Sequence, residues 1–370
     1  MPGEQLPRDL VGDILCRLPL KSLARFRAVC KEWNTIWEDK SFSNYYLSRT
    51  RPQFMVATKY QTCSIEINLD EEDHVLSSIV ERDITLEYPC ETHTSLGYCD
   101  GFVLFCMQKK GFAIWNPWVR QNKFIENHVE FDYCGIGYDN LTGYKIFGLK
   151  RFYNSRGEDN YKVAIYECKS DVWKFINDNT GLEPRRLIML DNIVSINGNL
   201  YFVAIDTKTR ESFLQCFDFS EDKFKTICAN LPIMEGCYTG LLAVFRGDRL
   251  SLLMHSEEVD MKVEILVSKQ RVEKYGEVLE WISFMTVSIP NFPSLQPHIL
   301  YPRPTYFVDS EKRLFVCTFD EAEHLCIYIV KGDVLKKIPI DSVLVDIFCT
   351  TYMSYIPSFI SIPCVSREMS

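Results

Sequence analysis

The sequence lacks the motifs of common enzyme and metal sites. It has no H-E-x-x-H pair, no P-loop, no G-x-G-x-x-G turn and no G-x-S-x-G nucleophile motif. Its 15 cysteines never occur at C-x-x-C spacing, and none of its six histidines joins them in a ligand pattern. We therefore expect no cofactor and no metal, and we predict that the protein is not itself an enzyme. Cysteine–histidine pairs that meet only in the fold stay open as an alternative, because spacing does not reveal them.

Long apolar runs are also missing. No window approaches the ~18 consecutive apolar residues of a membrane-spanning helix, and the first residues have no apolar signal region. The odd number of cysteines, many within apolar runs, is typical of buried thiols in a reducing compartment. A formal charge of −9 argues against broad binding to nucleic acid or to an anionic membrane. We expect a cytoplasmic and/or nuclear protein that binds neither.

The first fifty residues predict three or four short helices. Leu10, Ile14, Leu15 and Leu18 recur at helical spacing, and Pro19 ends that stripe. A module of this size is too small to bury all its large apolar side chains. Periodicity alone leaves two interpretations: a helical cap folded back on the rest of the chain, or a docking module whose apolar side a partner covers.

The same segment resembles the F-box motif, and the resemblance covers nearly the whole motif without a gap. It is carried by Leu6-Pro7, Leu10, Ile14-Leu15, Leu18-Pro19, Lys21-Ser22-Leu23, Arg25-Phe26 and Val29-Cys30-Lys31-x-Trp33. The resemblance implies binding to the Skp adaptor, which links F-box proteins to a cullin–RING ubiquitin ligase. It also implies which residues face the adaptor, although some of them must pack inside the module instead. These residues are Leu6, Pro7, Leu10, Ile14, Leu15, Leu18, Pro19, Leu23, Phe26, Val29 and Trp33.

The remaining 320 residues predict β structure. Short apolar or alternating runs are separated by turn residues, and no long helical pattern occurs among them. Three stretches are typical of β-hairpins: residues 135–149, 193–203 and 241–254.

A strand–turn–strand pattern repeats through this region. Its anchor positions are Ile67, Trp115, Tyr166, Phe217, Leu266 and Ile329, which gives steps of 48, 51, 51, 49 and 63 residues. A period near 50 residues with four short strands per unit predicts a propeller of about six blades. A β-sandwich is the alternative, because the anchors are irregular. The expected fold class is α+β multidomain, with a helical domain at 1–50 and an all-β, propeller-like domain at 51–370.

Several segments of this second domain resemble the plant F-box-associated domain of type 1. Six segments carry the resemblance in order: Cys99-Asp100-Gly101, Trp115-Asn116-Pro117, Gly135–Asp139, Asn197–Tyr201, Phe217-Asp218 and Tyr352–Ser358. The domain is kelch-like in period but lacks the paired glycines of true kelch repeats. The resemblance implies a propeller-like domain that holds substrates, with these segments as structural markers.

Together the two resemblances imply the substrate-recognition adaptor of an SCF-type (Skp–cullin–F-box) E3 ubiquitin ligase, acting on an unknown protein substrate. The alternatives are an F-box scaffold without substrate turnover and a propeller-fold hydrolase. We predict substrate contact at two polar loops, Phe152–Asn160 and Lys269–Glu277, because loops vary without disturbing the sheets.

Overall fold

The computed structural model describes residues 8–16, 18, 20–27, 36–58, 61–69, 76–84, 93–107, 111–126, 129–153, 159–176, 186–206, 209, 211–228, 231, 239–256, 262–272, 279–289, 292–293, 304–321, 324–344 and 350–362. The chain begins with short helices and continues in strands. The helices among the described residues are α1 (Arg8–Cys16), α2 (Leu20–Arg27), the 3-10 helix η1 (Ile36–Glu38) and α4 (Lys40–Arg49).

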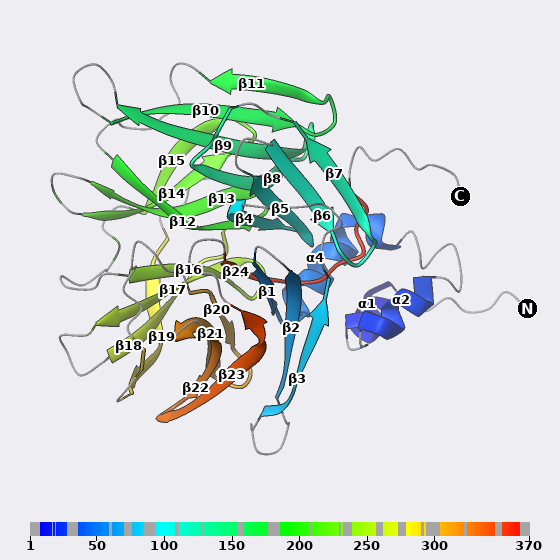
Figure 1. The fold of residues 1–370 in the computed structure, drawn as a ribbon, viewed down its shortest axis with the longest axis vertical. Coiled ribbons are helices and arrows are strands. Elements are labelled where there is room, and N and C mark those ends of the chain that lie inside the picture. Colours follow the sequence, from blue (N-terminus) through cyan, green and yellow to red (C-terminus); the bar gives the residue numbers. More distant parts are fainter. Residues whose placement is uncertain are drawn as a thin grey trace, which may run out of the picture.

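The strands form six four-stranded antiparallel sheets arranged around one axis (Figure 1). Each sheet is a blade, and in blades 2 to 6 the strands run from the axis outward in chain order. Blade 1 consists of β24 (Thr351–Tyr355), β1 (Gln53–Ala57), β2 (Thr62–Leu69) and β3 (Leu76–Asp83). Blade 2 consists of β4 (His93–Cys99), β5 (Phe102–Met107), β6 (Gly111–Asn116) and β7 (Gln121–Ile125). Blade 3 consists of β8 (Tyr133–Asp139), β9 (Gly143–Tyr153), β10 (Asp159–Glu167) and β11 (Val172–Ile176).

The second half of the ring repeats this order. Blade 4 consists of β12 (Arg186–Ile196), β13 (Asn199–Asp206), β14 (Ser212–Asp218) and β15 (Lys223–Cys228). Blade 5 consists of β16 (Thr239–Phe245), β17 (Arg249–Ser256), β18 (Lys262–Ser268) and β19 (Trp281–Ser288). Blade 6 consists of β20 (Tyr306–Asp309), β21 (Leu314–Glu321), β22 (His324–Lys331) and β23 (Val334–Leu344).

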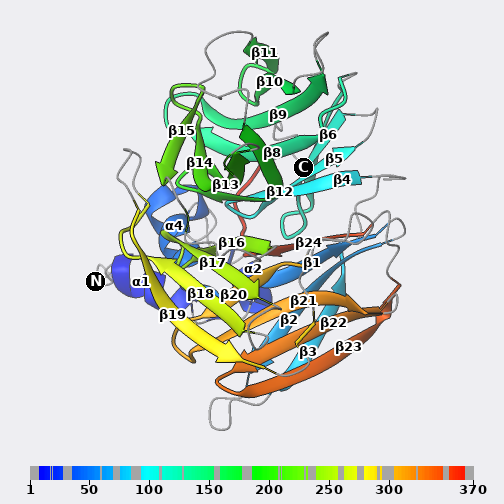
Figure 2. The same ribbon diagram turned by 90° about the vertical axis from the view of Figure 1, so that its left-hand side faces the viewer.

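Blade 1 closes the ring by joining the two ends of the propeller. Its innermost strand, β24, comes from the C-terminal end and pairs with β1 from Gln53↔Tyr355 to Ala57↔Thr351, as Figure 2 shows. Behind this pair the buried Tyr355 hydroxyl donates to Ser64 Oγ at 2.6 Å, and Ser64 Oγ donates to Gln53 Oε1 at 2.6 Å. The ends of the propeller are therefore locked to each other by both backbone and side-chain hydrogen bonds.

The predicted six-blade propeller is confirmed, and the β-sandwich alternative is wrong. All six anchor residues of the repeat lie on the third strand of a blade, on β2, β6, β10, β14, β18 and β22. The long 63-residue step has a simple cause, because the connection from β19 to β20 spans 289–305. The three predicted hairpins are confirmed as β8–β9, β12–β13 and β16–β17.

The core lies between neighbouring blades. Six clusters of buried apolar residues each combine side chains of two adjacent blades, so that every interface around the ring has its own core. Between blades 3 and 4, for example, the rings of Phe147 and Phe217 are 4.6 Å apart and both are fully buried. This arrangement follows from the sheets themselves, because a single blade has two apolar faces that only its neighbours cover.

Ion pairs between neighbouring blades recur at equivalent positions from one blade to the next. Lys123 of β7 reaches Asp171 of the next blade at 2.8 Å, and Lys174 of β11 reaches Asp222 of the following blade at 2.6 Å. Asp171, Asp222 and Arg120 all have positive φ in the turn between the third and fourth strands. These exposed pairs contribute little energy, but their spacing confirms that blades 2 to 4 are close structural repeats.

Candidate functional site

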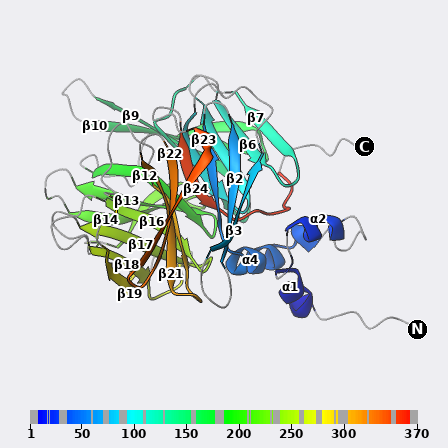
Figure 3. The ribbon, with the colours of Figure 1, turned by 60° about the horizontal axis from the view of Figure 1, so that its bottom comes forward.

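The N-terminal helices lie against one face of the propeller, which we call the F-box face (Figure 3). This face carries the turns between the first and second strands of the blades. Arg51, just before β1, forms an ion pair of 2.6 Å with Asp309 in the blade 6 turn. A Cβ on Gly247, in the blade 5 turn, would lie 2.7 Å from the Cα of Ser48 in α4. The end of α4 is therefore seated closely on the ring.

An aromatic cluster joins the helices to the propeller. Trp37 is buried, and its ring meets Phe42, Tyr46 and Phe359 edge-on, with centroids 4.9, 4.8 and 5.2 Å away. Phe359 comes from the C-terminal segment and also contacts Trp118 of blade 2 at 6.3 Å. Edge-to-face pairs of this kind add about 0.5–1.5 kcal/mol each beyond the area that they bury. A seventh apolar cluster thus includes residues of both domains.

The C-terminal segment that carries Phe359 is held by blade 2. The buried Asn116 side chain donates to the carbonyl oxygens of Ser358 and Ile360 at 3.1 and 2.8 Å. Ser358 Oγ donates to the carbonyl oxygen of Asp100 at 2.8 Å, directly beside Gly101. Three of the segments that carry the sequence resemblance therefore meet at this junction and stabilise it. They are the segments around Gly101, Asn116 and Ser358.

The outer side of α1 carries two exposed apolar side chains. Leu10 is 50% exposed and Ile14, one turn later, is 48% exposed. Leu15 and Leu23 are 3% and 1% exposed and belong to the same buried cluster as Trp37, and their predicted contact with the adaptor stays a prediction. Large apolar side chains left exposed side by side on a helix are typical of a surface that another protein covers.

The other predicted adaptor contacts have mixed positions. Leu18 and Phe26 are half-buried, and Leu18 packs against the same cluster as Leu15. The side chains of the remaining predicted residues lie outside the described residues; these are Leu6, Pro7, Pro19, Val29 and Trp33.

The two predicted substrate loops lie on opposite faces of the ring. Phe152–Asn160 joins the second and third strands of blade 3, with Tyr153 paired to Asp159, on the face away from the helices. Lys269–Glu277 follows the third strand of blade 5, on the F-box face. Residues 154–158 and 273–277 of these loops lie outside the described residues. Their role in substrate contact stays a prediction.

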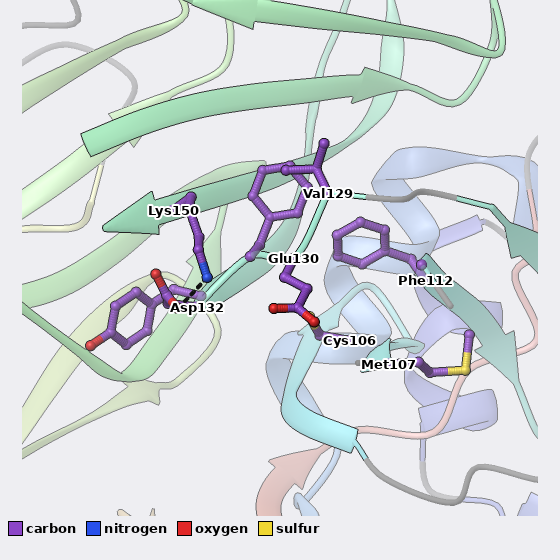
Figure 4. A pocket seen from close by; sticks show the side chains of 10 residues that line it. Cys106, Met107, Phe112, Val129, Glu130, Asp132 and Lys150 are labelled. Carbon is purple, nitrogen blue, oxygen red and sulfur yellow. Dashed lines mark hydrogen bonds and ion pairs between the residues drawn. The ribbon is translucent and has the colours of Figure 1, made fainter. Parts of the chain in front are cut away.

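The face away from the helices also contains a pocket that the sequence did not indicate (Figure 4). It lies between blades 2 and 3 and has a volume of about 220 Å³. Its lining combines apolar and charged side chains, among them Met107, Phe112, Val129, Glu130, Asp132 and Lys150. Such a pocket depends on how two blades meet, and exposed acids such as Glu130 carry no distinguishing sequence signal.

Nine cysteines whose side chains the structure describes are buried, and several have thiols that resist ionisation. Burial raises the pKa of both Cys63 and Cys216 to about 12, which disfavours the reactive thiolate. No group of three or more His, Cys, Asp or Glu side chains among the described residues is placed to hold a metal. Within that same part of the chain, no helix is long and apolar enough to cross a membrane.

The fold defines a class of protein in which a small helical domain, with an exposed apolar pair, is seated on one face of a closed six-bladed β-propeller. Comparison with known proteins identifies both domains. The family model of the F-box domain matches residues 4–45, and that of the F-box associated beta propeller domain matches residues 53–362. The chain therefore belongs to the plant F-box proteins that carry an F-box-associated propeller domain.

Relatives from Arabidopsis thaliana resemble the chain over nearly its whole length. It is 38% identical to "F-box protein At3g17710", covering 100% of both chains. It is also 38% identical to "Putative F-box/kelch-repeat protein At1g12170", over 97% of this chain and 99% of that one. "Protein SUPPRESSOR OF NIM1 1" is 37% identical, over 97% of this chain and 98% of that one.

Proposed function

We propose that this protein is the substrate receptor of an SCF-type ubiquitin ligase. Its F-box domain would bind a Skp-type adaptor and, through it, a cullin–RING ligase, while the propeller holds a protein to be ubiquitinated. The observation that carries the proposal is the exposed pair Leu10 and Ile14 on α1. This pair lies in the F-box, the domain through which such receptors join the ligase.

The rigid junction between the domains supports the same function. A receptor has to hold its target at a defined position relative to the ligase, and the shared core around Trp37 and Phe359 fixes the propeller on the F-box. In this proposal the chain is a non-catalytic subunit of the cytoplasm and/or nucleus, and its partners carry out the transfer of ubiquitin.

The adaptor contact is tested by the double variant Leu10→Ala, Ile14→Ala. Truncating one buried anchor at an interface often costs ~2 kcal/mol or more, about thirtyfold in affinity. We expect the variant to lose co-precipitation of a purified Skp-type adaptor while it keeps the thermal unfolding temperature of the parent. Leu141→Ala is the matched control, because Leu141 is 87% exposed on the propeller. Undiminished adaptor binding by the double variant would refute the proposal.

Substrate turnover needs a separate experiment, because an F-box scaffold would bind the adaptor equally well. Proteins bound to the tagged chain are compared by mass spectrometry with the proteasome active and blocked. If the chain is a receptor, we expect at least one partner to accumulate with attached ubiquitin when the proteasome is blocked. This accumulation should require an intact Leu10–Ile14 pair. A partner set that is the same in all arms would favour the scaffold.

A further inference from the structure

One wall of the pocket between blades 2 and 3 is closely packed. Phe131, next to Glu130, is 6% exposed and stacks on Trp173 with centroids 5.7 Å apart and planes 20° apart. Its ring lies so close to Gly148 that a Cβ there would be 2.8 Å from it. The backbone that carries Glu130 is thereby held against β9, and a preorganised side chain loses little entropy on binding.

The two acidic side chains of the pocket differ in their partners. The Asp132 carboxylate forms an ion pair with Lys150 Nζ at 3.1 Å and accepts a hydrogen bond from the backbone N–H of Arg151 at 2.7 Å. Glu130 is exposed and has no hydrogen-bond or ion-pair partner among the residues that the structure describes. Figure 4 shows its carboxylate extending into the pocket between Lys150 and Phe112. Among the lining residues that the structure describes, Glu130 is therefore the one acid without a counter-charge.

The rest of the lining is apolar and the volume is small. Met107 and Phe112 are 5% and 1% exposed, and Val129 at the rim is 41% exposed. Ligand sites for drug-sized molecules measure roughly 300–1,000 Å³, whereas this pocket measures about 220 Å³. It is the right size for one or two side chains of a peptide, with a long alkyl stem against the apolar wall and a cationic head at Glu130.

We infer that this pocket is a subsite for a basic side chain, arginine or lysine, next to an apolar residue in the bound protein. The inference rests on the proposed function and specifies the chemistry of the target segment. It also places the subsite on the face away from the F-box, where a bound segment does not compete with the helices for space. The charge of Glu130 supplies the selectivity, and Met107 and Phe112 supply the apolar contact.

The test uses the purified full-length chain and a library of nine-residue peptides with arginine, glutamine or glutamate fixed at the centre and random flanks. Bound peptides are sequenced. We expect the arginine-centred pool to be enriched, with apolar neighbours. Glu130→Gln should lower that enrichment about fivefold, the effect of one partly screened ion pair, and Glu130→Lys should shift it to the glutamate-centred pool. Glu126→Gln, an exposed acid at the end of β7, is the matched control and should change nothing.

The result is decisive in each case. An absence of enrichment, an acidic preference of the parent chain, or an arginine preference that survives Glu130→Lys would overturn the inference. Adaptor co-precipitation is measured on the same variants and should stay intact. Failure of the parent chain to bind the adaptor would refute the proposed function, whereas failure in the library with intact adaptor binding would refute this subsite alone.

Discussion

Phe359 packs edge-on against Trp37, with ring centroids 5.2 Å apart, although nearly the whole chain separates the two residues. The contact joins the last described segment of the chain to the F-box, and Asn116 of blade 2 holds that segment in place. The position of the F-box on the ring is therefore determined by residues at both ends of the sequence.

Phe359→Ala should loosen the F-box from the propeller. Removing a buried phenylalanine typically costs about 3–5 kcal/mol, and here the loss falls on the junction between the domains. We expect limited proteolysis to cleave the variant near residue 50 faster than the parent, while the propeller fragment survives. Phe124→Ala is the control, because Phe124 is 36% exposed. Equal cleavage of parent and Phe359→Ala would show that the aromatic contact does not hold the domains together.

Gly101→Ala should destabilise the same junction through the blade 2 turn. Gly101 has a φ of +93°, and a Cβ there would overlap the Ser358 side chain. Gly143→Ala separates the two effects, because Gly143 has a φ of +88° with nothing within 4 Å of the added atom. We expect about 1 kcal/mol of destabilisation for Gly143→Ala, from backbone strain alone, and a clearly larger loss for Gly101→Ala in denaturant unfolding. Equal losses would mean that the contact with Ser358 relaxes without cost.

Ending the chain after residue 350 should open the ring. The truncation removes β24 together with Tyr355, which leaves β1 without its inner neighbour and deprives Ser64 of its buried hydrogen-bond partner. An unpaired strand edge with exposed apolar surface favours aggregation, so we expect no cooperative thermal transition. A chain that ends after residue 362 retains β24 and the Phe359 segment and should melt as the parent does. A sharp, unshifted transition in the shorter chain would contradict closure by β24.

Asp320 should make stability depend on pH near neutrality. Burial raises the pKa of its carboxyl to about 7, partly opposed by the hydrogen bond that the Tyr352 hydroxyl donates to it. The unfolded chain has a carboxyl pKa of about 3.9. The folded state therefore binds the proton more tightly, and this contribution to stability is fully present below the unfolded pKa and is lost as the pH rises through 7.

The variant Asp320→Asn removes this dependence. We expect it to be more stable than the parent at pH 8, by about 1–2 kcal/mol because part of the carboxyl is solvated. The difference should shrink steadily as the pH falls below 7 and reach zero only near pH ~4, the unfolded pKa. Thermal unfolding across this range measures it, with Asp333→Asn in the exposed β22–β23 turn as the control. A difference between variant and parent that does not change with pH would contradict the raised pKa.

The repeating part of the fold was predictable from the sequence because its signal is local. Trp115, Tyr166 and Phe217 each end a short apolar run that is followed by a turn, and this pattern alone located the third strands of blades 2 to 4. Pairing of β24 with β1 was not predictable, because no local pattern states which distant strand completes a sheet.

The candidate sites were only partly predictable for a related reason. Helical spacing placed Leu10, Ile14 and Leu15 on one stripe, but it does not distinguish a side chain that a partner covers from one that Trp37 covers. The pocket at Glu130 arises where two blades meet, and nothing in the local sequence sets this acid apart from other exposed acids such as Glu126. Features formed by contacts between distant segments thus required the structure.

Because the last strand closes the ring, the newly made protein cannot complete its fold until translation has nearly ended. The ribosome completes β1 about 300 residues before it completes β24, and at ~5–20 residues per second this interval is roughly 15–60 s. During that time blade 1 lacks its innermost strand, although later blades can already pair within themselves. A nascent chain in this state exposes a strand edge, so chaperones are expected to engage it until translation ends. Premature termination anywhere before residue 351 would leave a chain that never closes and that quality control has to remove.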